Sequence, residues 1–197
     1  MTLDLKPATL EGRFVRLEPL TPELREEVRL ALDCDEEGWS IMSSSGQGAH
    51  FDKRWANAVA EQAAGTRQPY AVRRLVDGVV VGTCAFSNIR SLHRGVEMGW
   101  AFYRPDARGG PVNPEVKRLM LAHAFAAGAL RVELMVDVRN VRSQAAVLKL
   151  GATREGTLRR HKVTWTGHIR DTAVFSITDL DWPSVRDGLD QRLAAYW

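Results

Sequence analysis

The chain has 197 residues, of which 45% are hydrophobic and 26% are charged, and its formal net charge is +3. This length suits one domain, residues 1–197, while the spread of the arginines along the chain argues against nucleic-acid binding. The chain has no apolar run of ~20 residues and its start does not resemble a signal peptide, so we expect a cytoplasmic protein that does not span a membrane.

The two cysteines, Cys34 and Cys84, form no spaced cluster with histidines. We therefore expect reduced thiols and neither a metal site nor a disulfide. Cys84 has no base near it in the sequence, which disfavours a nucleophilic role. His123 is expected to be a packed or partnered helix residue.

The first third of the chain predicts a strand and two helices. Residues 13–20 alternate apolar and polar side chains, as a strand does. Thr21 supplies an N-cap for the helix that follows, with proline in its first turn. Residues 38–49 are rich in Ser and Gly and predict a loop or a broken helix. Residues 51–64 predict a helix whose apolar residues recur every four positions: Trp55, Val59 and Ala63.

The centre of the chain predicts a hairpin and a further strand. Residues 70–76 and 79–86 flank Asp77-Gly78, a pair that suits the positive φ angles of a tight primed turn. Residues 94–103 predict the next strand.

The last third predicts two helices around a strand, then a hairpin and a final helix. A helix over 113–127 and a strand over 131–138 come first. Gly151 then ends a short helix over 140–150. The expected buried stripe of this helix is Val141, Ala145 and Leu148. A second hairpin, over 157–165 and 169–177, precedes an appended helix over 183–197. The whole order indicates a mixed α/β fold with one central sheet.

A turn rich in glycine follows the strand over 94–103. Gly109 and Gly110 remove side chains where a ligand could approach the backbone, and Asn113 is the expected N-cap of the next helix. The free N–H groups of that first turn would suit a phosphate. A plain connecting turn that binds nothing is the alternative.

Glu97 is the unusual residue of the strand over 94–103. Alternation puts Val96, Met98, Trp100 and Phe102 on one face, and Glu97, Gly99 and Ala101 on the other. Burying a carboxylate in an apolar strand costs free energy unless the carboxylate is paired or in contact with solvent. It is therefore either a functional group beside an open space or a structural partner of Arg16 or Arg94.

The helix over 140–150 begins with two polar residues. Asn140 is its expected N-cap, and Ser143 lies in the first turn, away from the predicted apolar stripe. Without further information, these are also what an ordinary helix start contains.

Taken together, the three segments resemble the GCN5-related N-acetyltransferase (GNAT) superfamily, and within it the RimJ/RimL-like branch of ribosomal-protein N-terminal acetyltransferases. The similarity covers nearly the whole chain, from residue 10 to residue 183. Its most specific stretches are residues 96–99, 112–117, 137–143 and 150–152. The resemblance implies a mostly antiparallel, splayed central sheet flanked by helices, in which the 94–103 and 131–138 strands part at one end.

The resemblance also implies a site for acetyl coenzyme A. Backbone amides of Gly109, Gly110, Val112 and Asn113 would hold the pyrophosphate, with Arg108 in the place of the family's Gln or Arg. Amides near Trp100, Ala101 and Phe102 would bond the pantetheine arm. Asn140 would touch the coenzyme, and Ser143 would lie near its sulfur. The chain departs from the family turn at Pro111, which has no N–H, and Pro114 removes another donor.

The activity implied is acyl transfer, most simply of acetyl, to a primary amine on a small molecule or a protein N-terminus. Glu97 would take the proton of the amine and Ser143 would assist the departing thiolate. Three aromatic residues are candidates for the acceptor walls: Trp39, His161 and Trp165. Succinyl transfer and a non-catalytic coenzyme A sensor are the alternatives, although a sensor needs neither Glu97 nor Ser143. Homodimers occur in this branch, so the resemblance allows a dimer.

Overall fold

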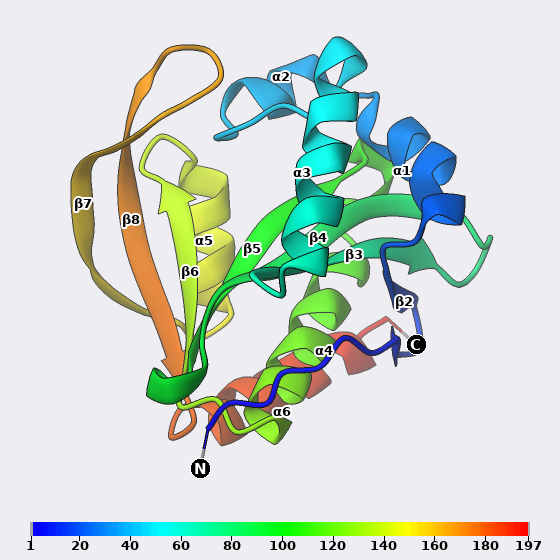
Figure 1. The fold of residues 1–197 in the computed structure, drawn as a ribbon. Helices are drawn as coiled ribbons and strands as arrows, with labels where there is room; N and C mark the ends of the chain where they lie inside the picture. The colour runs from blue at the N-terminus through cyan, green and yellow to red at the C-terminus, as the bar shows by residue number, and fades with distance from the viewer. Residues whose placement is uncertain (1, 197) are drawn as a thin grey trace.

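The computed structural model describes residues 2–196, so the two ends of the predicted 1–197 domain, Met1 and Trp197, lie outside the described residues. The fold is mixed α/β, built on one eight-stranded sheet with the order β1-β2-β3-β4-β5-β6-β8-β7 (Figure 1). All neighbouring strands are antiparallel except β5 and β6, which are parallel. The strands are β1 (Leu10–Glu11), β2 (Val15–Pro19), β3 (Arg67–Arg74), β4 (Val80–Arg90), β5 (Gly95–Tyr103), β6 (Arg131–Asp137), β7 (Thr153–Val163) and β8 (Ile169–Thr178).

Six α-helices cover the two faces of this sheet (Figure 1). Three of them, α1, α2 and α3, lie on one face, and α4 and α6 lie together on the other. Their bounds are α1 (Arg25–Leu32), α2 (Glu36–Ser40), α3 (Phe51–Ala63), α4 (Val112–Ala126), α5 (Val141–Lys149) and α6 (Trp182–Ala194). No helix within residues 2–196 is both long enough and apolar enough to cross a membrane.

The two faces of the sheet have separate apolar cores. The larger core lies between strands β2, β3, β4, β5, β6 and β8 on one side and helices α4, α5 and α6 on the other. It includes Met98, Met120 and Phe175. The smaller core lies under α1, α2 and α3, around Trp39 and Phe102. Burial of apolar area at ~25 cal/mol per Å² is the main force that holds the helices to the sheet.

The N-terminal hairpin is attached to α4 by one buried carboxylate. Glu115 accepts the backbone N–H groups of Arg13, Phe14 and Val15 at 2.8, 2.6 and 2.7 Å. Gly12 lies so close that a Cβ there would come within 2.4 Å of the Glu115 carboxyl carbon. This contact fixes β1 and β2 on the first turn of α4, a link between residues about a hundred positions apart.

The predicted elements are present, with two differences at their ends and turns. Residues 75–79 join β3 to β4, and only Gly78 of the expected Asp-Gly turn has a positive φ, of 72°. The side chain of Asp77 instead bonds Arg74 and the N–H of Val79, which makes a wider turn. Thr21 precedes a short 3-10 turn and makes no side-chain cap, so α1 begins later than expected.

Two predicted helix faces are wrong. In α5, Val141 and Leu148 are 71% and 52% exposed, and the buried residue is Val147. In α3, Val59 is exposed, while Phe51 and Ala58 are buried. In both helices apolar residues occur on more than one face. The side that meets the sheet is decided by the connections to the neighbouring strands.

Candidate active site

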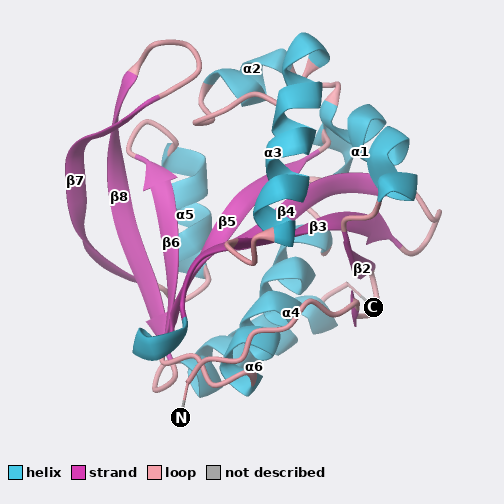
Figure 2. Ribbon diagram, in the orientation of Figure 1, coloured by secondary structure: helices cyan, strands magenta, loops and turns pink. Residues whose placement is uncertain are grey.

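The parallel pair β5 and β6 separates after three residues. Gly95, Val96 and Glu97 pair with Arg131, Val132 and Glu133. Beyond these, β5 pairs only with β4 and β6 pairs only with β8 (Figure 2). The facing edges of both strands therefore lack a strand partner toward their C-terminal ends. An extended ligand can bond such an edge as a strand would. This confirms the splayed sheet.

A β-bulge at Trp100 accompanies this separation. Thr83 pairs with Phe102 and Ala85 pairs with Gly99, so Cys84 alone faces two residues of β5. Trp100 has a φ of 56°, in the left-handed region that non-glycine residues rarely adopt.

The bulge changes which residues share a face of β5. Val96 and Met98 belong to the larger core, as expected, but Phe102 belongs to the smaller core on the other face. Ala101, which was expected beside Glu97, packs against the larger core. The prediction of one alternating face through Phe102 is therefore wrong, because an inserted residue shifts a period of two by one.

Glu97 lies where the two strands part. Burial raises the pKa of its carboxyl above the ordinary value for a glutamate, and the nearby Glu133 acts in the same direction, against Lys162, Arg170 and Arg90. Within residues 2–196 this carboxyl has no hydrogen-bonding partner, and its Oε1 lies 3.6 Å from the place of a Cβ on Gly99. The alternative partners are engaged elsewhere: Arg16 pairs with Glu11, and Arg94 bonds the carbonyl of Gly128.

Glu97 belongs to a polar row that crosses the sheet. Residues directly opposite each other in neighbouring strands point to the same face. On the face that α3 covers, this row consists of Arg67, Ser87, Glu97, Glu133 and Ser176. Glu133 is neutralised by Arg90 and Arg131, each at 3.0 Å. Glu97 is thus the carboxylate of the row that has no ion-pair partner among the described residues.

The turn between β5 and α4 presents unbonded amides. Gly109 has a φ of 79°, which favours glycine, and a Cβ on Gly110 would meet no atom within 4 Å. The N–H groups of Gly109, Gly110, Val112 and Asn113 donate to no backbone oxygen within residues 2–196. Four donors therefore remain in spite of the two prolines.

The start of α4 differs from the prediction. The helix begins at Val112, its N-cap position is Pro111, and Asn113 lies in the first turn rather than capping it. Arg108 is committed to the protein, since its guanidinium contacts Asp35 at 2.5 Å and bonds the carbonyl of Tyr103 at 2.8 Å. Its side chain holds the start of α2 against the end of β5.

The start of α5 matches the prediction. Asn140 caps the helix by accepting the N–H of Ser143 at 2.9 Å, and Ser143 is half-buried. The starts of α4 and α5 follow the C-terminal ends of β5 and β6, the two strands that part. The topology thus places both helix N-termini at the open end of the gap between β5 and β6, and Glu97 at the end where the two strands still pair. Ligands of open α/β sheets bind at such carboxyl ends.

The three aromatic candidates for acceptor walls have different positions. Trp165, in the turn between β7 and β8, donates its indole N–H to the carbonyl of Trp39 at 3.0 Å and is 39% exposed. His161 bonds Thr172 on the same hairpin at 3.0 Å. The side chain of Trp39 is fully buried and stacks on Phe102 with ring centroids 3.9 Å apart. The side chain of Trp39 therefore cannot line an open wall. Only its backbone carbonyl contacts Trp165, through the hydrogen bond from the indole.

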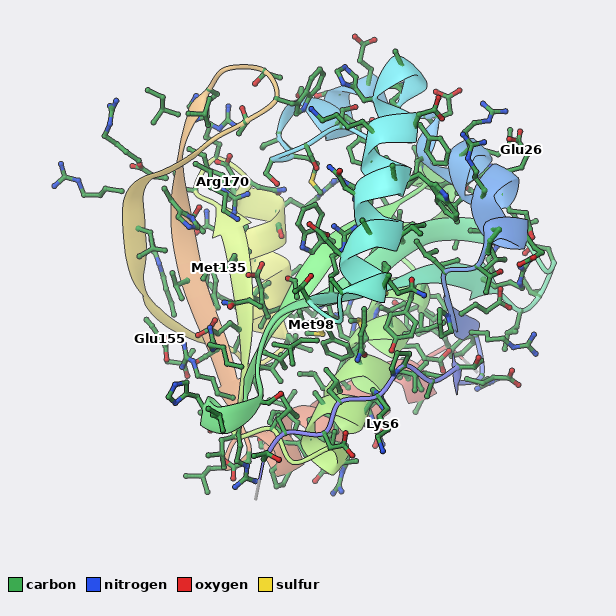
Figure 3. All side chains as sticks on the ribbon, in the orientation of Figure 1. Lys6, Glu26, Met98, Met135, Glu155 and Arg170 are labelled. Carbon is green, nitrogen blue, oxygen red and sulfur yellow. The ribbon has the colours of Figure 1, made fainter. Side chains whose placement is uncertain are left out.

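Contacts of charged side chains tie the β7–β8 hairpin to β6 near both of its ends. Arg170 on β8 donates to the carbonyl of Met135 on β6 at 3.2 Å (Figure 3). Glu155 on β7 bonds Arg131 of β6 and Ser176 of β8. These contacts fix the hairpin that carries His161 and Trp165.

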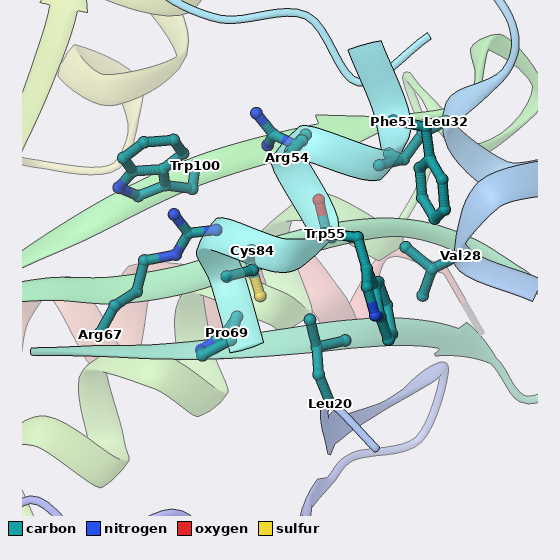
Figure 4. Close-up of a pocket in the computed structure, with 12 residues that line it drawn as sticks. Leu20, Val28, Leu32, Phe51, Arg54, Trp55, Arg67, Pro69, Cys84 and Trp100 are labelled. Carbon is teal, nitrogen blue, oxygen red and sulfur yellow. The ribbon is translucent and has the colours of Figure 1, made fainter. Parts of the chain in front are cut away.

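His123 and Cys84 behave as the sequence predicts, whereas two buried or half-buried arginines were missed. His123 contacts the carbonyl of Lys6 at 2.9 Å, and burial raises the pKa of the Cys84 thiol to about 12, which suits no nucleophile. Arg54 and Arg67, which the sequence did not single out, line a cavity of about 20 Å³ with Trp100 (Figure 4). Arginine on a strand or helix is common at surfaces, so their burial had no sequence signal.

The splayed sheet, the bulge and the unbonded turn before α4 define the fold class of coenzyme A-dependent acetyltransferases. A family model described as the acetyltransferase (GNAT) domain matches residues 15–153. The chain belongs to the GNAT acetyltransferase family.

Solved structures give the same result. A GCN5-related N-acetyltransferase from Brucella melitensis is 26% identical with a TM-score of 0.89, over 98% of this chain and 88% of that one. An acetyltransferase structure from T. thermophilus is 33% identical with a TM-score of 0.83, over 95% and 98%. Mycobacterium smegmatis RimJ, in complex with CoA-disulfide, shares the fold at 22% identity and a TM-score of 0.80, over 94% and 95%. The sequence has no significant match among curated proteins.

Proposed function

We propose that this protein transfers an acetyl group from acetyl coenzyme A to a primary amine, by direct attack of the amine on the thioester. The observation that carries the proposal is Glu97, a carboxylate of raised pKa without a hydrogen-bonding partner in residues 2–196, at the point where β5 and β6 part. The neighbouring structures of the family, RimJ with CoA-disulfide among them, support the choice of donor.

The reaction requires a base and a group that helps the thiolate to leave. An alkylammonium ion has no lone pair, so its proton must leave before its nitrogen can bond the carbonyl carbon. Glu97 accepts this proton, directly or through a water. The nitrogen then bonds the carbonyl carbon and the C–S bond breaks, and the hydroxyl of Ser143 hydrogen-bonds the thiolate or passes to it the second proton that the nitrogen loses. Amides near Trp100–Phe102 polarise the carbonyl oxygen.

The substrate thioester is positioned by backbone groups. The amides of Gly109, Gly110, Val112 and Asn113 are free to donate to the pyrophosphate, with help from the positive end of α4. The arm of the coenzyme then runs along the unpaired edge of β5, and Asn140 contacts it from the start of α5. We propose that the whole chain, 1–197, is the acting unit and works in the cytoplasm.

A transfer assay tests this proposal. Purified protein is given acetyl-CoA and a panel of amines, including N-terminal peptides, and release of free thiol is measured together with acetylated product. Glu97→Gln should reduce kcat by ~10²–10⁴ with an unchanged Kd for the coenzyme. If acetyl-CoA binds but no amine is acetylated, the sensor alternative replaces the enzyme. Turnover of succinyl-CoA in preference to acetyl-CoA would change the donor.

A further inference from the structure

A cation without a counterion among residues 2–196 borders the smaller core. This cation is Arg54 of α3, which is half-buried. Its guanidinium donates to the hydroxyl of Ser44 at 2.8 Å and lies over the rings of Trp39 and Trp100, at 5.2 and 5.5 Å. A guanidinium has five N–H donors, so most of its hydrogen-bonding capacity is left over.

Two arginines that are more deeply buried are neutralised. Arg67 pairs with Glu61 at 2.7 Å, and Arg170 lies 4.0 Å from Asp137. Arg54 has no carboxylate within ion-pair distance in the described part of the chain, and the charge that acts on it is another cation, Arg67. Burial lowers the pKa of Arg54 to about 10, which leaves it charged near neutral pH. The unbonded nitrogens of Arg54 are not fully buried, so an anion that approaches from solvent can pair with them.

A second donor points to the same place. The Nε of Arg67 is buried and has no hydrogen-bonding partner within residues 2–196. Its guanidinium lies 4.0 Å from the centre of the Trp100 ring, and the guanidinium of Arg54 lies 5.5 Å from the same ring centre. Figure 4 shows Arg54 and Arg67 on the Trp100 side of the cavity, away from its apolar end at Leu20 and Val28. The cavity itself, of about 20 Å³, has room for little more than a water.

This pair of cations lies near the proposed base. Trp100 donates its indole N–H to Ser87 at 3.2 Å, and Ser87 is the cross-strand partner of both Glu97 and Arg67. Arg67 is thus two strands from Glu97, about 10 Å at the usual strand spacing. All these side chains are on the face that α3 covers.

We infer that Arg54, assisted by Arg67, binds an oxyanion group of the acceptor, so that the preferred substrates are amines that also carry a carboxylate or a phosphate. This inference rests on the proposed function and narrows its acceptor class. The ammonium of such a substrate faces Glu97, and the oxyanion faces the guanidinium of Arg54. Arginine suits this role because its planar donors match the two oxygens of a carboxylate.

Matched acceptors test the inference on the unaltered protein. ω-Amino carboxylates of increasing chain length are compared with their carboxamides and with aminoalkyl phosphates, using acetyl-CoA as donor. The expected result is a kcat/KM at least about tenfold higher for one of the anionic series than for its neutral match, the loss expected for one charged hydrogen bond. The two anionic series separate carboxylate from phosphate. Equal kcat/KM for anionic and neutral acceptors overturns the inference.

A variant assigns the preference to Arg54. In Arg54→Gln the ratio of anionic to neutral kcat/KM should fall toward one, while Lys53→Gln, which removes an exposed cation from the same helix, should keep it. An unchanged ratio in Arg54→Gln contradicts the inference. So does a variant that changes the use of succinyl-CoA as donor and leaves the preference among acceptors as it was. Should Arg54→Gln not fold, the wild-type comparison alone decides.

A binding measurement separates this inference from the proposed function. Inorganic phosphate and glutarate are titrated into wild-type protein and Arg54→Gln, and Tm and tryptophan fluorescence are followed, since Trp39 and Trp100 flank Arg54. Stabilisation of the wild type alone supports the anion site even if no amine is acetylated. Amine acetylation without any anion effect keeps the enzyme and removes the site.

Discussion

At the scale of single residues, the environment of Glu97 sets a pH dependence. Its pKa is raised by burial and by Glu133, and it is lowered by Lys162, Arg170 and Arg90, with burial the largest effect. A general base acts only when deprotonated. kcat/KM should therefore rise with pH through the raised pKa of Glu97, above the ordinary pKa of a glutamate, until the carboxylate is fully formed.

The measurement is a pH profile of kcat/KM with a primary alkylamine as acceptor, which stays protonated over the acidic range, so that only the enzyme titrates there. In Glu97→Gln the acidic limb should disappear along with most of the turnover. Persistence of the same limb in Glu97→Gln would assign it to another group.

Gly110 gives a prediction about the coenzyme alone. A Cβ at this position meets nothing within 4 Å, so Gly110→Ala should leave the free energy of unfolding almost unchanged. If the turn holds a pyrophosphate, the added methyl lies against it, and we expect the Kd for coenzyme A to rise roughly tenfold, about 1.4 kcal/mol. Isothermal titration measures this. Gly156→Ala is the matched control, because its position on β7 is equally open.

At the scale of elements, Glu115 is expected to hold the N-terminal hairpin. Its carboxylate accepts three backbone N–H groups and is 5% exposed. Glu115→Gln replaces one acceptor oxygen by a donor and leaves a buried N–H without a partner, which should cost about 2–3 kcal/mol of unfolding free energy. Chemical denaturation measures the change, and Glu37→Gln on the exposed side of α2 is the control. An equal loss in both variants would remove this role.

Strand β7 should weaken in acid. The hydrogen bond from Arg131 lowers the pKa of Glu155 to about 2, with help from Ser176. A group whose pKa is lower in the folded state stabilises above its unfolded pKa, and this contribution is lost as the pH falls from about 4.5 to about 2. Glu155→Gln should lose less stability than the wild type over this window. The effect is small because each side chain of the pair is about a third exposed to solvent.

The elements also show why some predictions from the sequence were right. The hairpin of β3 and β4, the cap of α5 by Asn140 and the splay of β5 from β6 follow from local signals or from the family resemblance. The faces of α3 and α5 do not. Each helix has apolar residues on two sides, so periodicity alone does not choose the buried one.

At the scale of the whole molecule, the proposed ligand bridges segments that the free protein leaves apart. β5 and β6 share three residue pairs, and the starts of α4 and α5 follow their separated ends. Acetyl-CoA should thus raise the Tm with its concentration, by the equivalent of about 2.7 kcal/mol at a hundred times Kd. Differential scanning fluorimetry measures this. No rise at saturating acetyl-CoA would contradict the assigned coenzyme site.

Which segments form strands and helices could be predicted from the sequence alone, and the sequence also singled out Glu97, Asn140 and Ser143. Hydrophobic periodicity, caps and turn residues are local, so they can be read from neighbours in the chain. Other features depend on how distant segments pack in the folded chain. The tertiary structure placed Phe102 opposite its expected face through the bulge at Trp100, and it buried Trp39. It also left Arg54 without a counterion among the described residues, because strand register and the packing of distant helices depend on residues far apart in the chain.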